Sequence, residues 1–142
     1  MLTNQLATAS DYQLILNIWE QSVLATHDFL KPDDLNFYKE QIPQFFNQTT
    51  LRIWSLDHQP IGFTGTNGPE LEMFFLDPHY IGGGHGHQIL TWLINHQQIT
   101  KIDVNEQNQH AKTFYLNHGF TVASRSERDG FGKPYPILHL EK

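Results

Sequence analysis

The sequence predicts a mixed α/β domain, and three observations support this fold class. Strand-like and helix-like segments alternate along the chain, apolar residues recur at helical spacing, and Gly, Pro, Asn and Asp separate the apolar runs. Of the 142 residues, 39% are hydrophobic and 17% charged, a size and composition typical of one folded domain. No internal repeat, low-complexity tract or linker interrupts the pattern, so we expect a single domain over residues 1–142.

The N-terminal third is expected to hold one strand and two helices. Residues 2–7 form the candidate strand, and Ser10 or Asp11 can cap a helix whose apolar side chains fall on one face. After residues 25–30, Asp33 is expected to cap a second helix. That helix would carry the apolar residues Leu35, Phe37, Tyr38, Ile42, Phe45 and Phe46.

The remaining two thirds predict six strands and two helices. Three strand-like runs come first, followed by a glycine-rich loop that leads into a helix. A buried-type strand then precedes a helix over about residues 106–117, which Gly119 ends as a left-handed cap. Two strands complete the expected order. The six strands are expected at residues 51–56, 61–66, 70–76, 100–104, 120–126 and 135–140.

Composition excludes several function classes. The chain contains no cysteine, which rules out disulfides, a thiolate nucleophile and cysteine-ligated zinc. A net charge of -6 argues against nucleic acid or an anionic membrane as partner. The N-terminus lacks a signal-peptide pattern, and no apolar run approaches the ~20 residues of a membrane span, so we expect a cytoplasmic protein.

The glycine-rich loop is the first candidate binding site. It runs from Gly82 to Gly86, between a strand that stops at Pro78 and the start of a helix. Backbone N–H groups at such a helix start can hold an anion such as a pyrophosphate. No Gly-Lys-Ser/Thr follows, and the spacing fails the G-x-G-x-x-G pattern, which excludes two better-known phosphate loops. The alternative is a flexible turn before a helix.

A second pattern lies in the helix that Gly119 ends. Asn108, Ala111, Phe114 and Tyr115 share one face. Tyr115 is the ionisable member of that set, and a phenol can act as a general acid. The alternative is that the aromatic pair simply belongs to the hydrophobic core.

Together these two segments resemble the GNAT (Gcn5-related) N-acetyltransferase superfamily. The segment from Ile81 to Gly86 is similar to its acetyl-CoA signature Gln/Arg-x-x-Gly-x-Gly/Ala. The later motif Asn-x-x-Ala-x-x-Phe-Tyr-x-x-x-Gly-Phe is met from Asn108 to Phe120. Residues 25–30 and 132–136 further resemble the small bacterial YjaB-type branch.

The resemblance implies a fold and a cofactor. It implies a central, twisted, mostly antiparallel sheet flanked by about four helices and splayed between the fourth and fifth strands. Acetyl-CoA is the implied cosubstrate, held by Phe75 and Leu76 on the fourth strand and by Asn108. The glycine loop would hold the pyrophosphate through Ile81, Gly82, Gly83, Gly84, His85, Gly86 and His87.

The implied reaction is direct transfer of an acetyl group to a primary amine, with Tyr115 protonating the departing thiolate. A backbone N–H near Phe75 would stabilise the oxyanion. One departure matters, because Ile81 stands where the family has Gln or Arg. It leaves a non-catalytic acyl-CoA-binding or sensing domain as the alternative.

Further residues are weaker candidates. Glu72 or Glu70 can serve as the general base, or be surface carboxylates. His27, beside Asp28, can accept a proton or contact substrate, or have only a local capping or packing role. His85 and His87 have no Asp, Glu or Cys at ligand spacing, so no metal site is expected. The acceptor, a small-molecule or peptide amine, and the choice between monomer and homodimer stay open. Five aromatic residues could line an acceptor pocket or belong to the core: Trp19, Phe29, Phe37, Tyr38 and Phe46. Lys133 and Tyr135 either approach the acceptor site or form a closing turn.

Overall fold

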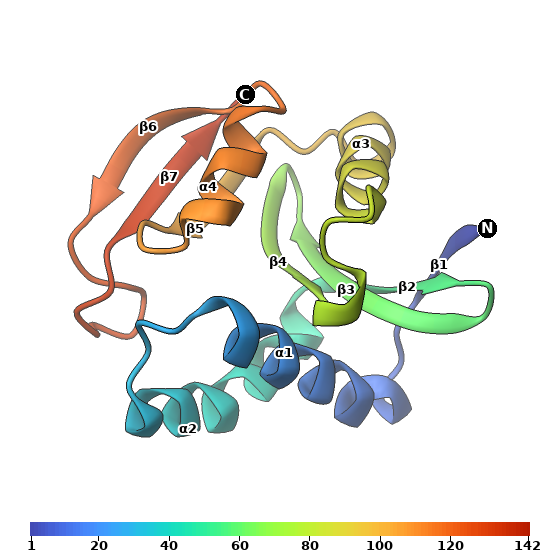
Figure 1. The fold of residues 1–142 in the computed structure, drawn as a ribbon, viewed down its shortest axis with the longest axis horizontal. Coiled ribbons are helices and arrows are strands. Elements are labelled where there is room, and N and C mark those ends of the chain that lie inside the picture. The colour runs from blue at the N-terminus through green and yellow to red at the C-terminus, as the bar shows by residue number, and fades with distance from the viewer.

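A computed structural model describes all residues from 1 to 142 and contains one seven-stranded sheet with four α-helices (Figure 1). The strand order is β1-β2-β3-β4-β5-β7-β6. The strands are β1 (Leu2–Leu6), β2 (Thr50–Leu56), β3 (Gln59–Asn67), β4 (Glu70–Leu76), β5 (Lys101–Asn105), β6 (Thr121–Ser126) and β7 (Ile137–Glu141). The helices are α1 (Tyr12–Thr26), α2 (Pro32–Gln41), α3 (His85–Gln97) and α4 (Gln109–Leu116). No helix is both long enough and apolar enough to cross a bilayer.

The sheet opens between β4 and β5. Every other strand pair is antiparallel, whereas β4 and β5 run parallel and pair only at Glu70↔Lys101 and Leu71↔Ile102. Beyond Leu71 the two strands diverge, as Figure 1 shows. The predicted mostly antiparallel sheet, splayed between its fourth and fifth strands, is therefore confirmed.

A β-bulge marks the point where the opening begins. Gly65 of β3 pairs with Met73 of β4, and Thr66 pairs with Leu71, so Glu72 is an extra residue on β4. A bulge bends its strand and increases the local twist. Because it directly follows the last pair between β4 and β5, it turns β4 away from its parallel neighbour.

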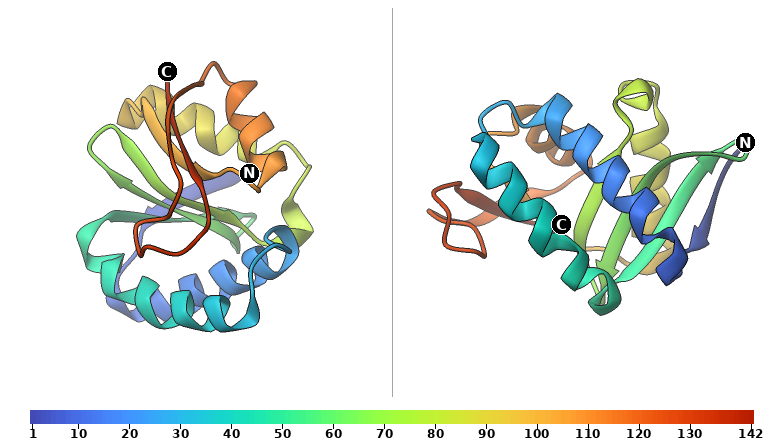
Figure 2. Two further views of the ribbon diagram at one scale, coloured as in Figure 1. Left: turned by 90° about the vertical axis from the view of Figure 1, so that its left-hand side faces the viewer. Right: turned by 90° about the horizontal axis from the view of Figure 1, so that it is seen from below.

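The helices cover the sheet in two layers, with α1 and α2 on one face and α3 and α4 on the other (Figures 1 and 2). Successive side chains of β4 alternate between the two resulting cores. Met73 and Phe75 pack with the α1–α2 core, whereas Phe74 and Leu76 pack with the α3–α4 core. The open part of β4 is thereby anchored on both faces.

Two helices differ from their predicted bounds. Lys31, not Asp33, is the N-cap of α2, and the helix ends at Gln41 before a 3₁₀ segment, Ile42–Gln48. Pro43 explains this end, because proline inside an α-helix removes a hydrogen bond and clashes with the preceding turn. Helix α4 begins at Gln109 rather than near residue 106, because the Asn108 side chain accepts a hydrogen bond from the Ala111 N–H at 3.3 Å and caps the helix there.

The first helix begins where the sequence predicts, because Asp11 is the N-cap residue of α1. A single 3₁₀ turn, Ala9–Asp11, precedes the helix, and Thr8 is the N-cap of that turn. The Thr8 N–H donates a hydrogen bond to the Asp11 carboxylate at 2.9 Å. The Asp11 side chain therefore closes a capping box with Thr8 at the 3₁₀ turn and makes no capping hydrogen bond to α1 itself.

Candidate active site

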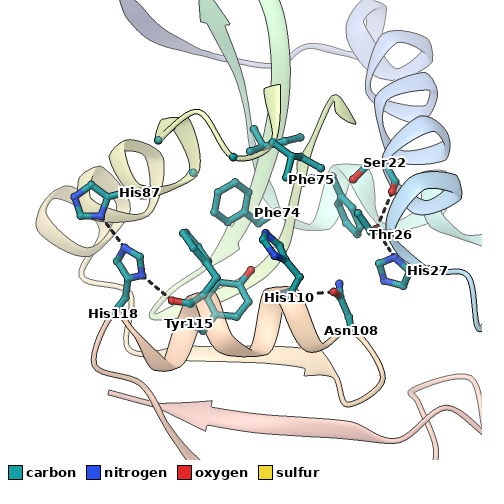
Figure 3. Close-up of a pocket in the computed structure, with 17 residues that line it drawn as sticks. Ser22, Thr26, His27, Phe74, Phe75, His87, Asn108, His110, Tyr115 and His118 are labelled. Atoms are coloured by element: carbon teal, nitrogen blue, oxygen red, sulfur yellow. Dashed lines mark hydrogen bonds between the residues drawn. The ribbon is translucent and has the colours of Figure 1, made fainter. Parts of the chain in front are cut away.

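A cavity of about 370 Å³ lies at the opening of the sheet (Figure 3). Four elements meet there: the end of α1, the open part of β4, the glycine loop with the first turn of α3, and α4. The lining residues are Ser22, Thr26, His27, Phe74, Phe75, Leu76, Ile81, Gly82, Gly84, Gly86, His87, Asn108, His110, Ala111, Phe114, Tyr115 and His118. Residues as far apart in the chain as Ser22 and His118 thus form one site.

The glycine loop presents free backbone donors to this cavity. Gly82 and Gly84 have φ angles of 89° and 84°, a left-handed conformation that other residues adopt only with strain. Gly84 is the N-cap of α3, and the first bond of that helix runs from the Gln88 N–H to the Gly84 oxygen. The N–H groups of residues 85–87 therefore have no partner within the helix, and they lie at its positive end.

Gly86 brings the start of α3 close to its neighbours. A Cβ at this position would lie 3.4 Å from Cζ of Phe114 and 3.7 Å from Cδ1 of Leu76. The first turn of α3 therefore packs closely on α4 and β4 at this position. An anion held by the loop and a group lying along β4 would consequently share one cavity.

The open edge of β4 carries a second set of backbone groups. The Asp77 N–H donates to the Ile61 oxygen at 2.7 Å, and the Phe75 oxygen points at Gly62 of β3, 2.7 Å from where a Cβ would stand. Backbone groups alternate in direction along an antiparallel strand, so those of Phe74 and Leu76 face the opening. The backbone N–H groups near Phe75 that face the opening are therefore those of Phe74 and Leu76.

Tyr115 lies at the centre of the site. Its side chain is only 7% exposed and packs against Phe114 and Phe120. Burial raises the pKa of the Tyr115 hydroxyl above its ordinary value, so the phenol is protonated at neutral pH. The hydroxyl forms no hydrogen bond within the protein and points into the cavity (Figure 3). It is free to donate a proton or a hydrogen bond to a ligand.

His27 ends α1 on the opposite side of the cavity. Its Nδ1 lies 2.7 Å from Oγ1 of Thr26, whose hydroxyl donates to the Ser22 oxygen at 2.7 Å. Because Thr26 has only that one proton, Nδ1 of His27 must be the donor, which leaves Nε2 as an acceptor. Burial lowers the pKa of His27 to about 4, against an opposing effect of the Asp28 carboxylate. The ring is therefore neutral at physiological pH.

Asn108 caps helix α4, a structural role that the sequence motif does not indicate. Its side-chain oxygen caps α4 through the Ala111 N–H, while its amide NH₂ group forms no hydrogen bond within the protein. The residue lines the cavity beside His110 (Figure 3). One side chain can thus both start α4 and contact a ligand.

Three sequence-predicted residues do not line the cavity: Glu72, Gly83 and His85. Glu72, the bulged residue, lies in a separate hollow of about 380 Å³ at the closed end of the β4–β5 pair. It accepts a hydrogen bond from Nδ2 of Asn67 at 3.4 Å and shares this hollow with Glu70. A Cβ at Gly83 would lie 3.2 Å from the ring of His85, which packs against Tyr80 rather than entering the cavity.

The aromatic residues between α1 and α2 are mainly core. Trp19, Tyr38 and Phe46 are buried, and Phe29 and Phe37 pack against them. The connection from β6 to β7 is tied to this layer, because the Tyr38 hydroxyl donates to the Asp129 carboxylate. The Lys133 ammonium forms an ion pair with Asp34 at 3.0 Å.

Several lining residues were not singled out by the sequence, among them Ser22, Thr26, Phe74, His110 and His118. A signal for His118 was present, because it follows Tyr115 by three residues and Ala111 by seven, a helical spacing that favours the same face. The cavity lining carries no permanently charged side chain. It includes no Lys, Arg, Asp or Glu, so only histidines can change its charge near neutral pH.

Comparison with known proteins identifies the class of protein that this fold and site define. Residues 19–132 match the family model described as an acetyltransferase (GNAT) domain. The chain belongs to the GNAT acetyltransferase family and is an N-acetyltransferase.

Within the family the chain is similar to YjaB-type members. It is 36% identical over 127 residues to the peptidyl-lysine N-acetyltransferase YjaB of Salmonella typhimurium, which covers 89% of this chain and 88% of that protein. The solution structure of apo-form YjaB from Escherichia coli superposes with a TM-score of 0.91 at 32% identity, over 99% of this chain and 97% of that one. The yncA protein of Salmonella typhimurium, solved with acetyl-CoA, shares the fold, with a TM-score of 0.66, 16% identity and coverage of 100% and 93%.

Proposed function

We propose that this protein transfers the acetyl group of acetyl-CoA directly to a primary amine, with the side chain of a peptidyl lysine as the acceptor. One observation carries the proposal: the free donors of the glycine loop, the open edge of β4 and the Tyr115 hydroxyl all border one cavity. The similarity to YjaB, a peptidyl-lysine N-acetyltransferase, supports the choice of acceptor. The acetyl-CoA found with yncA supports the choice of cosubstrate.

The donor set of the cavity fits acetyl-CoA. The free N–H groups of residues 85–87 suit the pyrophosphate, since they combine backbone donors with the positive end of a helix dipole. The outward backbone groups of Phe74 and Leu76 suit the amides of the pantetheine arm, which would pair with β4 as an added strand does. The NH₂ group of Asn108 is a further donor for that arm.

Tyr115 and a backbone N–H group are proposed to promote the chemical step. Acetyl-CoA supplies an activated acyl group whose C–S bond breaks as the C–N bond forms. We propose that the N–H of Phe74 stabilises negative charge on the acyl oxygen, which leaves the Phe74 oxygen and the backbone groups of Leu76 for the pantetheine arm. The Tyr115 hydroxyl gives a proton to the leaving sulfur. Burial keeps that proton on Tyr115 until it is needed.

The amine must lose a proton during the same reaction, and we propose His27 as its acceptor. His27 is neutral, borders the cavity and directs an unprotonated Nε2 away from its own hydrogen bond to Thr26. Glu72 is proposed for a different task, since it lies in the hollow on the closed side of the opening. Its carboxylate, with that of Glu70, favours the approach of a cationic acceptor.

A non-catalytic acyl-CoA-binding domain is the second candidate, and Ile81 is the observation that favours it. This residue lines the cavity where the family pattern has Gln or Arg, so one phosphate contact is missing. Under this candidate, acetyl-CoA binds but no amine is acetylated.

Incubation with acetyl-CoA and a peptide panel separates the two candidates. The panel contains one lysine peptide with a blocked N-terminus, its Lys→Arg counterpart, and the same sequence with a free N-terminus and no lysine. Mass spectrometry should detect a gain of one acetyl group on the lysine peptide alone. Acetylation of only the free N-terminus would overturn the lysine assignment. Saturable binding with no product on any peptide, or on a broad panel of small primary amines, would support the non-catalytic alternative.

A further inference from the structure

His87 and His118 join the two helices that border the cavity. His87 lies in the first turn of α3, and His118 follows the last turn of α4. Nδ1 of His87 lies 2.7 Å from Nε2 of His118, and Nδ1 of His118 lies 2.7 Å from the Phe114 oxygen (Figure 3). The two rings therefore form a hydrogen-bonded chain that starts at a backbone carbonyl and ends at Nε2 of His87.

One added proton changes which ring nitrogens of this chain donate and which accept. A carbonyl oxygen only accepts, so Nδ1 of His118 carries a hydrogen. In the neutral pair, Nε2 of His118 must then accept the Nδ1 proton of His87, which leaves Nε2 of His87 bare. One added proton makes Nε2 of His87 a donor, whichever ring holds the charge. Protonation thus changes the end of the chain from an acceptor that repels an anion into a charge-assisted donor.

The surroundings favour placing this charge on His118. The negative end of the α4 dipole lies at His118, whereas the positive end of the α3 dipole lies at His87. The Lys142 ammonium donates to the His118 backbone oxygen at 3.1 Å and opposes protonation. His110 also lines the cavity, His85 shares the first turn of α3, and no carboxylate lines the cavity. A bound anion is therefore needed to balance the added charge.

We propose that the His87–His118 pair binds the pyrophosphate of the CoA cosubstrate and takes up one proton as it does so. The pair would supply the positive charge that an Arg at position 81 would bring and that Ile81 lacks. This inference rests on the proposed function, because it assumes a CoA thioester in the cavity. Uptake of a proton makes affinity rise as pH falls, by up to about tenfold per pH unit for each proton bound.

Calorimetric titration tests this proton uptake. The ligand is dephospho-CoA, because the 3′-phosphate of CoA itself titrates near pH 6 and would add its own protons. Titrations in two buffers of different ionisation enthalpy at pH 7 give the number of protons bound, and titrations from pH 6 to 8 give the change in affinity. The native protein should take up a proton, and its affinity should fall about tenfold or more across this range.

Three variants assign the proton. His87→Gln keeps a neutral donor near the position of Nε2, and His118→Asn keeps a donor for the Phe114 oxygen, so both should bind with no proton uptake. His96→Gln is the matched control. Like His118, His96 contacts the backbone oxygen of the residue four positions earlier, Trp92, at 3.1 Å, but it lies outside the cavity. It should behave as the native protein does. Circular dichroism checks that each variant folds, and His87 is exposed, so its replacement disturbs no core.

The outcomes separate this inference from the proposed function. Binding by the native protein without proton uptake, or uptake that persists in both His87→Gln and His118→Asn, would overturn the phosphate role of the pair. The acetyl-CoA assignment would survive either result. No binding of dephospho-CoA or acetyl-CoA at any pH would instead overturn the proposed function, and this inference with it.

Discussion

The Tyr135 hydroxyl donates a hydrogen bond to the carboxylate of Asp34, which lies 101 residues earlier in the chain. The same hydroxyl accepts a hydrogen bond from the Lys31 N–H at 3.3 Å. These contacts tie the connection between β6 and β7 to the start of α2. The tie joins this connection to the first two helices, since α1, α2 and the connection all pack around the same aromatic core.

Replacing Asp34 should therefore loosen this connection. Hydrogen bonds from Tyr135 and Lys133 hold the pKa of the Asp34 carboxyl below its usual value. A lowered pKa stabilises the folded protein above the unfolded value of about 4, and this stability is lost as pH falls further. Asp34→Ala should lower the midpoint of thermal unfolding at pH 7, and the difference from the native protein should shrink below about pH 4. Asp33→Ala, at the exposed neighbouring residue, should change the midpoint far less.

Tyr115→Phe tests the proposed proton donor. The variant keeps the ring that packs against Phe114 and Phe120 and removes only the hydroxyl. We expect kcat to fall by about 10²-fold, a typical contribution of general acid catalysis, while the Kd for acetyl-CoA stays nearly the same. Steady-state kinetics and calorimetry measure the two quantities. Tyr12→Phe, on α1 away from the cavity, serves as the control. An unchanged kcat in Tyr115→Phe would remove this residue from the mechanism.

His27 should make the folded protein sensitive to mild acid. Its pKa is lowered to about 4 in the folded state, so the unfolded chain binds more protons between about pH 4 and 6.5. Stability from the neutral ring is complete above about pH 6.5 and is lost as pH falls towards 4, by about 3 kcal/mol in total. Urea unfolding at pH 7.5 and 4.5 should show a smaller loss of stability in His27→Gln than in the native protein. Equal losses in the two proteins would contradict burial of a neutral His27.

The same residue predicts a feature of the pH–rate profile. Because His27 is already unprotonated above about pH 5, it cannot cause a rise in rate between pH 6 and 8. His27→Gln should lower kcat at every pH in that range and leave the shape of the profile unchanged. Loss of an inflection in the variant would show that His27 titrates during the reaction, contrary to this account.

Gly62→Ala should damage the cleft through the backbone. A Cβ at Gly62 would lie 2.6 Å from Cδ2 of Leu76 and 2.7 Å from the Phe75 oxygen, so β4 would have to move. Such overpacking costs about 1–3 kcal/mol of stability, and displacement of Leu76 should also weaken acetyl-CoA binding. Gly130→Ala is the control, because a Cβ there meets no atom within 4 Å. Chemical unfolding and calorimetry of the two variants compare these effects, and equal behaviour would contradict the close contact between β3 and β4.

Local patterns were sufficient for much of the candidate site. The glycine loop was recognisable because Gly82 and Gly84 adopt a backbone conformation that few other residues tolerate. Helical spacing placed Tyr115 on the face that borders the cavity. Element bounds were less secure, since the end of α2 depended on Pro43 and the start of α4 on the side chain of Asn108.

The sequence by itself therefore determined the order of elements, the glycine loop before α3 and the face of α4 that borders the cavity, because each depends on residues within one or two turns of one another. Only the tertiary structure decided that Glu72 lies outside the cavity and that His87 meets His118. The first depends on a bulge in the pairing of β3 with β4, and the second on the packing of α3 against α4. Both are contacts between segments far apart in the chain, whose register and packing are set by the fold as a whole.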